Sequence, residues 1–226
     1  MTFGESVLNF YKTLTVPRLL PAGIDILYPF KNNSTWELVE KFFMRYYSDN
    51  NPRTLLLGIN PGRYGSGLTG IGFTDPIRLE YDCGIPNDFD KRPELSSTFF
   101  YDVIRAYGGP KEFYSLFFIS AVSPLGFVKN GKNYNYYDEK KIETAIEPFA
   151  VNCLKNQLNF GCSPNIAISI GQGKNVSFLN RINHSYQLFK RIESLPHPRW
   201  VMQYRLKRKE EFIQEYLKVL NSIELS

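Results

Sequence analysis

Hydrophobic residues gather in four short runs, separated by longer segments of mixed polarity: residues 54–59, 117–122, 166–170 and 186–195. Glycine or proline follows each run closely, which is typical of buried strands that end in turns. The segments between the runs are long enough for helices, and this alternation favours βαβ units with parallel strands. We therefore predict a three-layer α/β/α fold around a central four-stranded, mainly parallel sheet.

Apolar residues at helical spacing predict six helices, near residues 6–13, 35–50, 98–107, 139–158, from 174 onwards, and 205–221. Ser34 and Glu37 fit a capping box at the start of the second helix. Ser96 or Ser97 can cap the third helix, and Asp138 can cap the fourth.

Two segments without such spacing are interpreted as loops. Residues 74–94 are dense in Asp, Pro and Gly, and residues 126–137 are polar and rich in tyrosine. The length of 226 residues fits one domain. Within it we expect an N-terminal helical wrap at residues 1–50 and an α/β core at residues 51–226.

Composition narrows the class of protein. A net charge of +5 and a pI of about 9.0 are compatible with a polyanionic partner. Cys83, Cys153 and Cys162 form no C-x-x-C pair, which argues against a disulfide framework and a closed zinc site. No apolar stretch has transmembrane length and the N-terminus lacks a signal-peptide pattern, so we expect a cytoplasmic protein.

Each predicted strand ends in a distinctive sequence: Asn60-Pro61-Gly62, Ser123-Pro124-Leu125, Gly171-Gln172-Gly173 and His197-Pro198. Ligands of open α/β sheets bind beyond the carboxyl ends of the strands, so these four endings predict one shared site. Asn60 supplies an amide, the glycines after it let backbone approach a ligand, and Phe73 supplies a flat apolar face. This combination suits a planar polar ligand such as a nucleobase.

The glycine-rich loop has other interpretations. Gly65-Ser66-Gly67-Leu68-Thr69-Gly70 matches the G-x-G-x-x-G pattern of dinucleotide sites. That fingerprint needs its first glycine at the strand end and a helix opening within the motif, whereas here the strand ends several residues earlier. No G-K-[ST] sequence follows, which excludes a P-loop. A purely structural glycine-rich loop remains as an alternative.

The chain has only two histidines. His184 lies in a predicted surface turn, and we assign it no role. His197 stands between Pro196 and Pro198, which restrict its backbone and hold the ring in a defined place. We predict a functional role for His197.

Gly58-Ile59-Asn60-Pro61-Gly62, with Thr69-Gly70 and Phe73 downstream, resembles the first motif of the uracil-DNA glycosylase superfamily. The resemblance is greatest to the single-strand-selective monofunctional family, whose motif reads G-M-N-P-G, and His197-Pro198 resembles its second motif. We identify the chain as a member of the bacterial second-type branch of that family, over residues 53–205. Further segments fall in matching order: Lys91-Arg92-Pro93, Gly109-Pro110, Ser123-Pro124-Leu125 and Gly131-Lys132-Asn133.

The resemblance implies roles for individual residues. Asn60 is implied to orient the water that attacks C1′, and His197 to donate a hydrogen bond to the base O2. Phe73 is implied to stack on the base, with Gly62 leaving room near the base C5 and Tyr64 in the same base-binding segment. No cofactor or metal is implied, and three cysteines are too few for the families that carry an iron–sulfur cluster.

One departure from the family concerns base recognition. The family's second strand ends F-V-H-N-L-C-P-L, where the Asn reads the uracil edge, but Ala121 occupies that position here. Alanine offers neither the donor nor the acceptor of an amide, so Ser120, Ser123 or backbone groups are the alternatives. Because the missing side chain also frees volume, we expect deaminated purines to be accepted as well as uracil.

The segment after His197 is expected to contact DNA. Arg199, Trp200 or Met202 could fill the gap left by a flipped base, although the family reads H-P-S-P-R-N here and the Ser-Pro pair is absent. The expected contacts to the DNA backbone are Lys132, Asn133, Arg205, Lys207, Arg208 and Lys209.

Together these observations predict a monomeric, monofunctional DNA glycosylase that excises deaminated bases from single- or double-stranded DNA by base flipping. No lysine replaces Asn60 or His197, so we expect hydrolysis without Schiff-base chemistry. The alternative is a non-catalytic nucleic-acid-binding protein that keeps the same fold.

Overall fold

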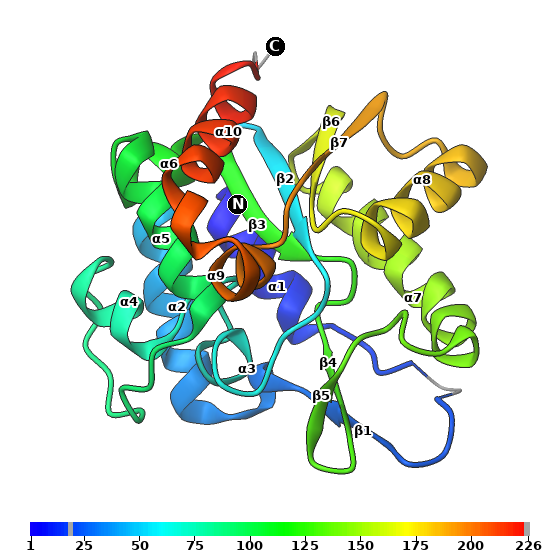
Figure 1. Cartoon of the computed structure of the whole chain (residues 1–226). Helices are drawn as coiled ribbons and strands as arrows, with labels where there is room; N and C mark the ends of the chain where they lie inside the picture. Colours follow the sequence, from blue (N-terminus) through cyan, green and yellow to red (C-terminus); the bar gives the residue numbers. More distant parts are fainter. Residues whose placement is uncertain (18–19, 224–226) are drawn as a thin grey trace.

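Four parallel strands form the central sheet of the computed structural model, which describes residues 1–17 and 20–223 (Figure 1). Helices cover both faces of this sheet, so the predicted three-layer α/β/α fold is confirmed. In spatial order the strands are β3 (Phe117–Ala121), β2 (Arg53–Gly58), β6 (Cys162–Ile170) and β7 (Arg191–Leu195).

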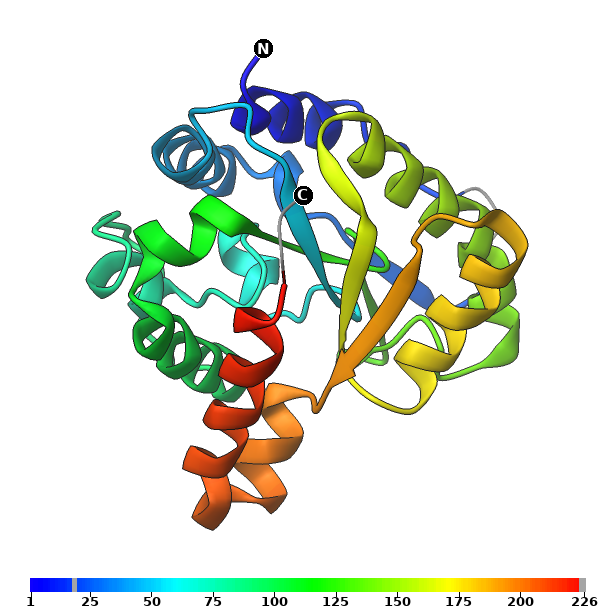
Figure 2. The ribbon, with the colours of Figure 1, turned by 90° about the horizontal axis from the view of Figure 1, so that it is seen from above.

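Helices from distant parts of the chain make up the outer layers (Figure 2). One face is covered by α7 (Lys140–Asn159) and α8 (Lys174–Tyr186). The other face is covered by α5 (Leu95–Tyr107), α6 (Pro110–Leu116) and α10 (Lys209–Asn221). The N-terminal helices α1 (Phe3–Lys12) and α2 (Asn33–Tyr46) pack on each other, and each places a phenylalanine against Phe118 of β3.

Strand β2 is buried along its whole length, as expected for a central strand between two helical layers. Its first residue is the unusual one, because Arg53 is buried with a charged side chain. The guanidinium donates to both carboxylate oxygens of Asp49, and also to the carbonyls of Asn51 and Tyr114. A buried charge is tolerated only when paired and hydrogen-bonded in this way, so Arg53 fixes where β2 begins.

A second, antiparallel sheet lies below the carboxyl ends of the central strands in Figure 1. It contains β1 (Ile24–Leu27), β4 (Gly126–Lys129) and β5 (Lys132–Tyr134). The prediction of a loop at residues 126–137 was therefore wrong. Asn130 and Gly131 both have positive φ, +49° and +70°, which is the backbone of a two-residue hairpin turn and the reason an Asn-Gly pair occurs there.

Three predicted helix caps were wrong. Asn32 caps α2 by accepting from the Thr35 N–H, which places Ser34 inside the helix rather than at the cap. Glu94, not Ser96 or Ser97, caps α5 through the Ser97 N–H.

Asp138 is engaged elsewhere, since it accepts from the Asn135 N–H, and α7 starts after Glu139 without a side-chain cap. For α2 and α5 a neighbouring side chain with the right reach takes the cap position, which the periodicity alone does not specify.

Several short helices were not predicted. They are η1 (Pro29–Lys31), α3 (Ser66–Thr69), α4 (Pro76–Tyr81), α6, α9 (Pro198–Tyr204) and η2 (Leu206–Arg208). The interpretation of residues 74–94 as loop missed α4, which Asp75 caps at the Arg78 N–H and which begins with proline. Strand β7 starts five residues later than predicted, because α8 extends through Tyr186.

Candidate active site

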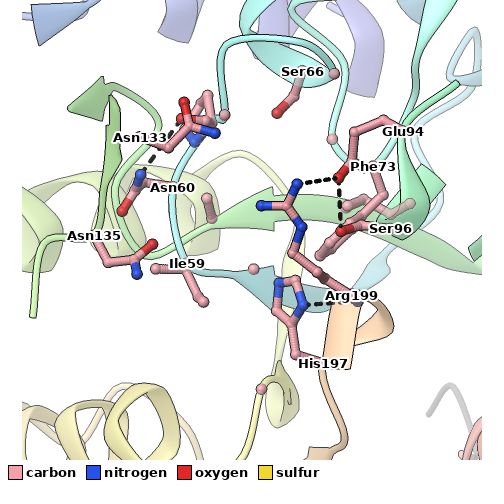
Figure 3. A pocket seen from close by; sticks show the side chains of 18 of the residues that line it. Ile59, Asn60, Ser66, Phe73, Glu94, Ser96, Asn133, Asn135, His197 and Arg199 are labelled. Carbon is pink, nitrogen blue, oxygen red and sulfur yellow. Dashed lines mark hydrogen bonds and ion pairs between the residues drawn. The ribbon is translucent and has the colours of Figure 1, made fainter. Parts of the chain in front are cut away.

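A cavity of about 360 Å³ opens at the carboxyl edge of the central sheet (Figure 3). Ten of the residues selected from the sequence line it: Asn60, Gly62, Tyr64, Phe73, Ser120, Ala121, Asn133, His197, Arg199 and Trp200. The volume lies within the range of small-molecule sites. The segments after β2 and β7, the end of β3 and the β4–β5 hairpin bring these residues together, as expected for the edge of a parallel sheet.

Two backbone groups at the end of the hairpin hold the Asn60 amide, in addition to a longer contact of 3.4 Å from its Nδ2 to the Pro61 carbonyl. Its Nδ2 donates to the Tyr134 carbonyl at 3.1 Å, and its Oδ1 accepts from the Tyr136 N–H at 3.1 Å. A carbonyl can only accept and an N–H can only donate, so these two partners fix which way the amide faces. Oδ1 keeps a second lone pair, which can accept a hydrogen bond from a ligand or water.

His197 caps α9 with its side chain. The Nδ1 atom accepts from the Arg199 N–H at 3.1 Å, so the neutral ring carries its proton on Nε2. Burial, together with the nearby Arg199 guanidinium, lowers the pKa of His197 to about 4. Near neutral pH the residue is therefore an uncharged imidazole with one N–H donor on the side away from the helix.

Phe73 forms an aromatic wall of the cavity. One face of its ring stacks on Phe100, with centroids 4.8 Å apart and planes 7° apart, and its edge approaches His197. The stacking covers one face, which leaves the other for a ligand. The backbone of Phe73 has φ +49°, a conformation that is rare for a bulky residue and that often marks functional positions.

Hydrogen bonds around this strained residue hold the turn in place. Thr69 Oγ1 donates to the Thr74 carbonyl at 2.6 Å, and Thr74 Oγ1 donates to the Gly72 carbonyl at 3.0 Å. A Cβ on Gly72 would stand 2.6 Å from the Ile119 side chain, so only glycine lets the turn approach β3 this closely.

The end of β3 forms the cavity wall that was expected to hydrogen-bond the polar edge of the base. Ser120 and Ala121 both line the cavity, but the Ser120 hydroxyl oxygen itself is buried and lies beside Tyr11. Burial raises the pKa of the neighbouring Tyr11, and the Ser120 hydroxyl opposes that rise. Ser123 does not line the cavity, because it is buried and donates to the Leu125 carbonyl.

A charged pair spans one side of the cavity mouth. Arg199 lies 3.8 Å from Glu94, and Ser96 donates to the same carboxylate oxygen at 3.1 Å (Figure 3). Neither Glu94 nor Tyr11 was selected from the sequence. Glu94 is 105 positions from Arg199 in the chain and Tyr11 lies in the N-terminal helix, so no local pattern connects either to the site.

Trp200 stands beside this pair on the rim, 39% exposed. Its ring packs edge-on against Phe212 and lies under the Arg205 guanidinium. Tyr64, also exposed, lines the cavity as well and carries the Arg92 guanidinium 4.4 Å from its ring centroid. Asn133 connects the hairpin to the segment that holds Tyr64 by accepting from the Arg63 N–H.

The remaining residues selected for DNA contact lie outside the cavity. Lys132 is exposed on the hairpin, and Arg205 and Lys207 are exposed after α9. Arg208 is paired with Glu211, and Lys209 is paired with Asp102. The basic run is therefore less positive than its sequence suggests.

Within residues 1–17 and 20–223, no group of three or more His, Cys, Asp or Glu side chains is placed to hold a metal ion. No described helix has the length and apolar character needed to cross a membrane.

Comparisons with known proteins agree with this geometry. Residues 44–221 match the uracil DNA glycosylase superfamily. The crystal structure of wild-type Pedobacter heparinus SMUG2 superposes with a TM-score of 0.95 at 45% sequence identity, over 98% of each chain. No curated protein sequence gives a significant match. The chain therefore belongs to the uracil DNA glycosylase superfamily, in its SMUG-like branch, and is a DNA glycosylase that hydrolyses N-glycosyl bonds.

Proposed function

We propose that this enzyme excises uracil, hypoxanthine and xanthine from DNA after flipping the damaged nucleotide into the cavity. The observation that carries the proposal is the pair Asn60 and His197. Their side chains line one cavity, and each is held in a single hydrogen-bonding orientation by backbone groups. Phe73 provides an aromatic surface in the same cavity.

In this proposal Asn60 positions the attacking water. Breaking an N-glycosidic bond gives an oxocarbenium-like sugar, which needs a well-placed nucleophile more than a strong base. The free lone pair on Oδ1 accepts a hydrogen bond from the water, and the two backbone contacts prevent the amide from rotating. Positioning by a neutral amide is sufficient for this step.

His197 stabilises the departing base. Negative charge grows on the base as the bond breaks, and a donor aimed at that charge lowers the barrier. The tautomer fixed by the Arg199 N–H leaves Nε2–H as the donor to the base O2. No proton needs to be taken up first, because the imidazole donates while neutral.

The direct test is incubation with a uracil-containing oligonucleotide followed by alkali treatment. A glycosylase leaves an abasic site, which alkali converts into a strand break. Strand scission only after alkali is the expected result. Absence of scission, with DNA binding intact, would contradict the proposed excision of uracil.

Flipping a base requires binding energy from the DNA backbone, because unstacking costs a few kcal/mol. We assign this to the rim and the hairpin. Trp200, Arg199 or Met202 enters the gap, and exposed cations contact phosphates. The proposed cations and polar contacts are Lys132, Asn133, Arg205, Lys207 and Arg208.

Arg205→Gln with Lys207→Gln should lower the slope of log binding constant against log salt by about two units. These two cations are exposed and free of ion pairs within the described residues. The measurement is a salt titration of oligonucleotide binding. Lys155→Gln with Lys190→Gln is the matched control, since it removes the same charge at the opposite edge of the sheet. Equal slopes for all three proteins would mean that the basic run is only solvated and does not contact phosphates.

The proposed base range depends on Ala121. A site that hydrogen-bonds a substrate edge rejects analogues lacking that edge, because buried partners would then go unpaired. Alanine has no polar side-chain group that needs a partner, and its small side chain leaves more room for the base. Backbone groups at the end of β3, or the Ser120 hydroxyl beside Tyr11, are then left to bind a carbonyl or a ring N–H, which uracil, hypoxanthine and xanthine all carry.

Ala121→Asn should shift selectivity towards uracil, by supplying an amide for the uracil edge and reducing the volume available to a purine. Single-turnover excision of uracil, hypoxanthine and xanthine from otherwise identical oligonucleotides measures the ratio. Ala121→Val separates the two effects, since it reduces the volume without adding an amide. Activity of the wild type on uracil alone, or a ratio unchanged in Ala121→Asn, would contradict the proposed range.

A further inference from the structure

The two backbone groups that hold Asn60 belong to a short segment whose own position must be fixed. Tyr134 is the last residue of β5 and Tyr136 follows shortly after it, and β5 pairs only with β4 in the described chain. The hairpin is thus joined to the small sheet and not to the central one that carries Asn60. Contacts other than strand pairing must set the distance between Asn60 and this segment, and one is the hydrogen bond from the Arg63 N–H to Asn133.

A second contact is the side chain of Tyr136. It is fully buried and packs edge-on against Phe178 of α8. Its hydroxyl donates to Oδ1 of Asn175 at 2.8 Å. The backbone N–H and the side-chain hydroxyl of one residue therefore bind Asn60 on one side and α8 on the other.

Asn175 completes a ring of hydrogen bonds back to β2. It lies in the first turn of α8, 1% exposed, and its Nδ2 donates to the Leu57 carbonyl at 3.3 Å and to Ser169 Oγ at 3.0 Å. Leu57 is three residues before Asn60. The ring runs from Asn60 through Tyr136 and Asn175 to the strand that carries Asn60.

A branch of the same network reaches the histidine side of the cavity. Ser169 Oγ donates to the Gly171 carbonyl at 2.8 Å, and the Gly171 N–H donates to the Leu195 carbonyl at 2.8 Å. Gly171 also lies against the His197 ring. Buried polar groups are satisfied only in specific geometries, so this network fixes the spacing of the segments that it joins.

We propose that Tyr136 and Asn175 are positioning residues for the reaction, which set the location of the Asn60 amide through the residue 134–136 backbone. Neither side chain lines the cavity, so they act through Asn60. This inference rests on the proposed role of Asn60 in placing water. It predicts that their effect on the rate disappears when Asn60 is removed.

The test is a double-mutant cycle in single-turnover excision of uracil. Tyr136→Phe deletes one buried oxygen and should slow excision about tenfold, less than the 10²-fold that a displacement of about 1 Å can cause. Binding to the oligonucleotide should stay within about twofold. In an Asn60→Ala background the same substitution should have no further effect. Tyr47→Phe is the matched control, because its buried hydroxyl donates to the Phe117 carbonyl at the opposite edge of the sheet.

Each outcome decides a separate question. A wild-type rate for Tyr136→Phe, or an equal slowing with and without Asn60, would overturn the positioning role. Asn175→Ala repeats the cycle from the other end of the hydrogen bond, should Tyr136→Phe fold poorly. Full activity of Asn60→Ala alone would instead refute the proposed function of Asn60, independently of any result at Tyr136.

Discussion

Asn60→Ala is expected to slow single-turnover excision of uracil by about 10²-fold or more, since misplacement of a reacting group by about 1 Å already has that effect. The alanine removes the amide oxygen that we assign to the attacking water. DNA affinity should change little, because Asn60 is uncharged and its amide bonds to backbone rather than to the rim. Excision rate and oligonucleotide binding are measured on the same preparation.

Asn183→Ala provides the matched control for this loss. Asn183 also binds a backbone N–H and a backbone carbonyl with one amide, both from Phe189, but it lies outside the cavity. It should retain the wild-type rate. An Asn60→Ala protein that cleaves within about threefold of wild type would remove Asn60 from the mechanism.

His197→Ala should reduce the single-turnover rate by about 10²–10³-fold, the usual effect of deleting one donor to a developing anion. His184→Ala is the natural control, because His184 is the other histidine of the chain and is exposed in the last turn of α8. The sequence analysis expected His184 in a surface turn. The residue is exposed, as expected, but it lies in a helix. An unchanged rate for His197→Ala would exclude the proposed donor.

The pH dependence follows from the same residue. The pKa of His197 is lowered to about 4 by burial, from about 6.5 in an unfolded chain. The wild-type rate should therefore show no titration of this histidine between about pH 5 and pH 8. Between those two pKa values the unfolded chain binds the extra proton, so the stability that this group contributes is lost as pH falls from about 6.5 to about 4.

The central sheet was predictable because its strands are apolar runs whose burial is visible in the sequence. The small sheet was not, because β1 exists only through pairing with β4, about a hundred residues later. The hairpin did carry a local signal in Asn130-Gly131, which the interpretation as a polar loop overlooked.

The candidate site likewise contains some residues that could be predicted from the sequence and others that could not. Asn60 and His197 directly follow strands, so their meeting at one edge could be inferred from topology alone. Tyr136 and Glu94 reach the site by tertiary packing, which no spacing rule reports. The pairing of Arg208 with Glu211, three residues on, was visible in the sequence and would have lowered the charge expected of the basic run.

The two hydrogen bonds between Asn60 and the hairpin also affect how well the protein tolerates a substitution of this residue. Functional residues often weaken the fold that carries them, so their loss tends to stabilise a protein. Here the proposed catalytic amide also joins the hairpin to the central sheet, and its removal forfeits two hydrogen bonds of about 1 kcal/mol each. A variant without this amide then excises bases more slowly and is also present at a lower concentration in the cell. A loss of about 1–2 kcal/mol in the free energy of unfolding can lower abundance several-fold. Inactive variants at this position would be removed by proteolysis as well as by selection on repair.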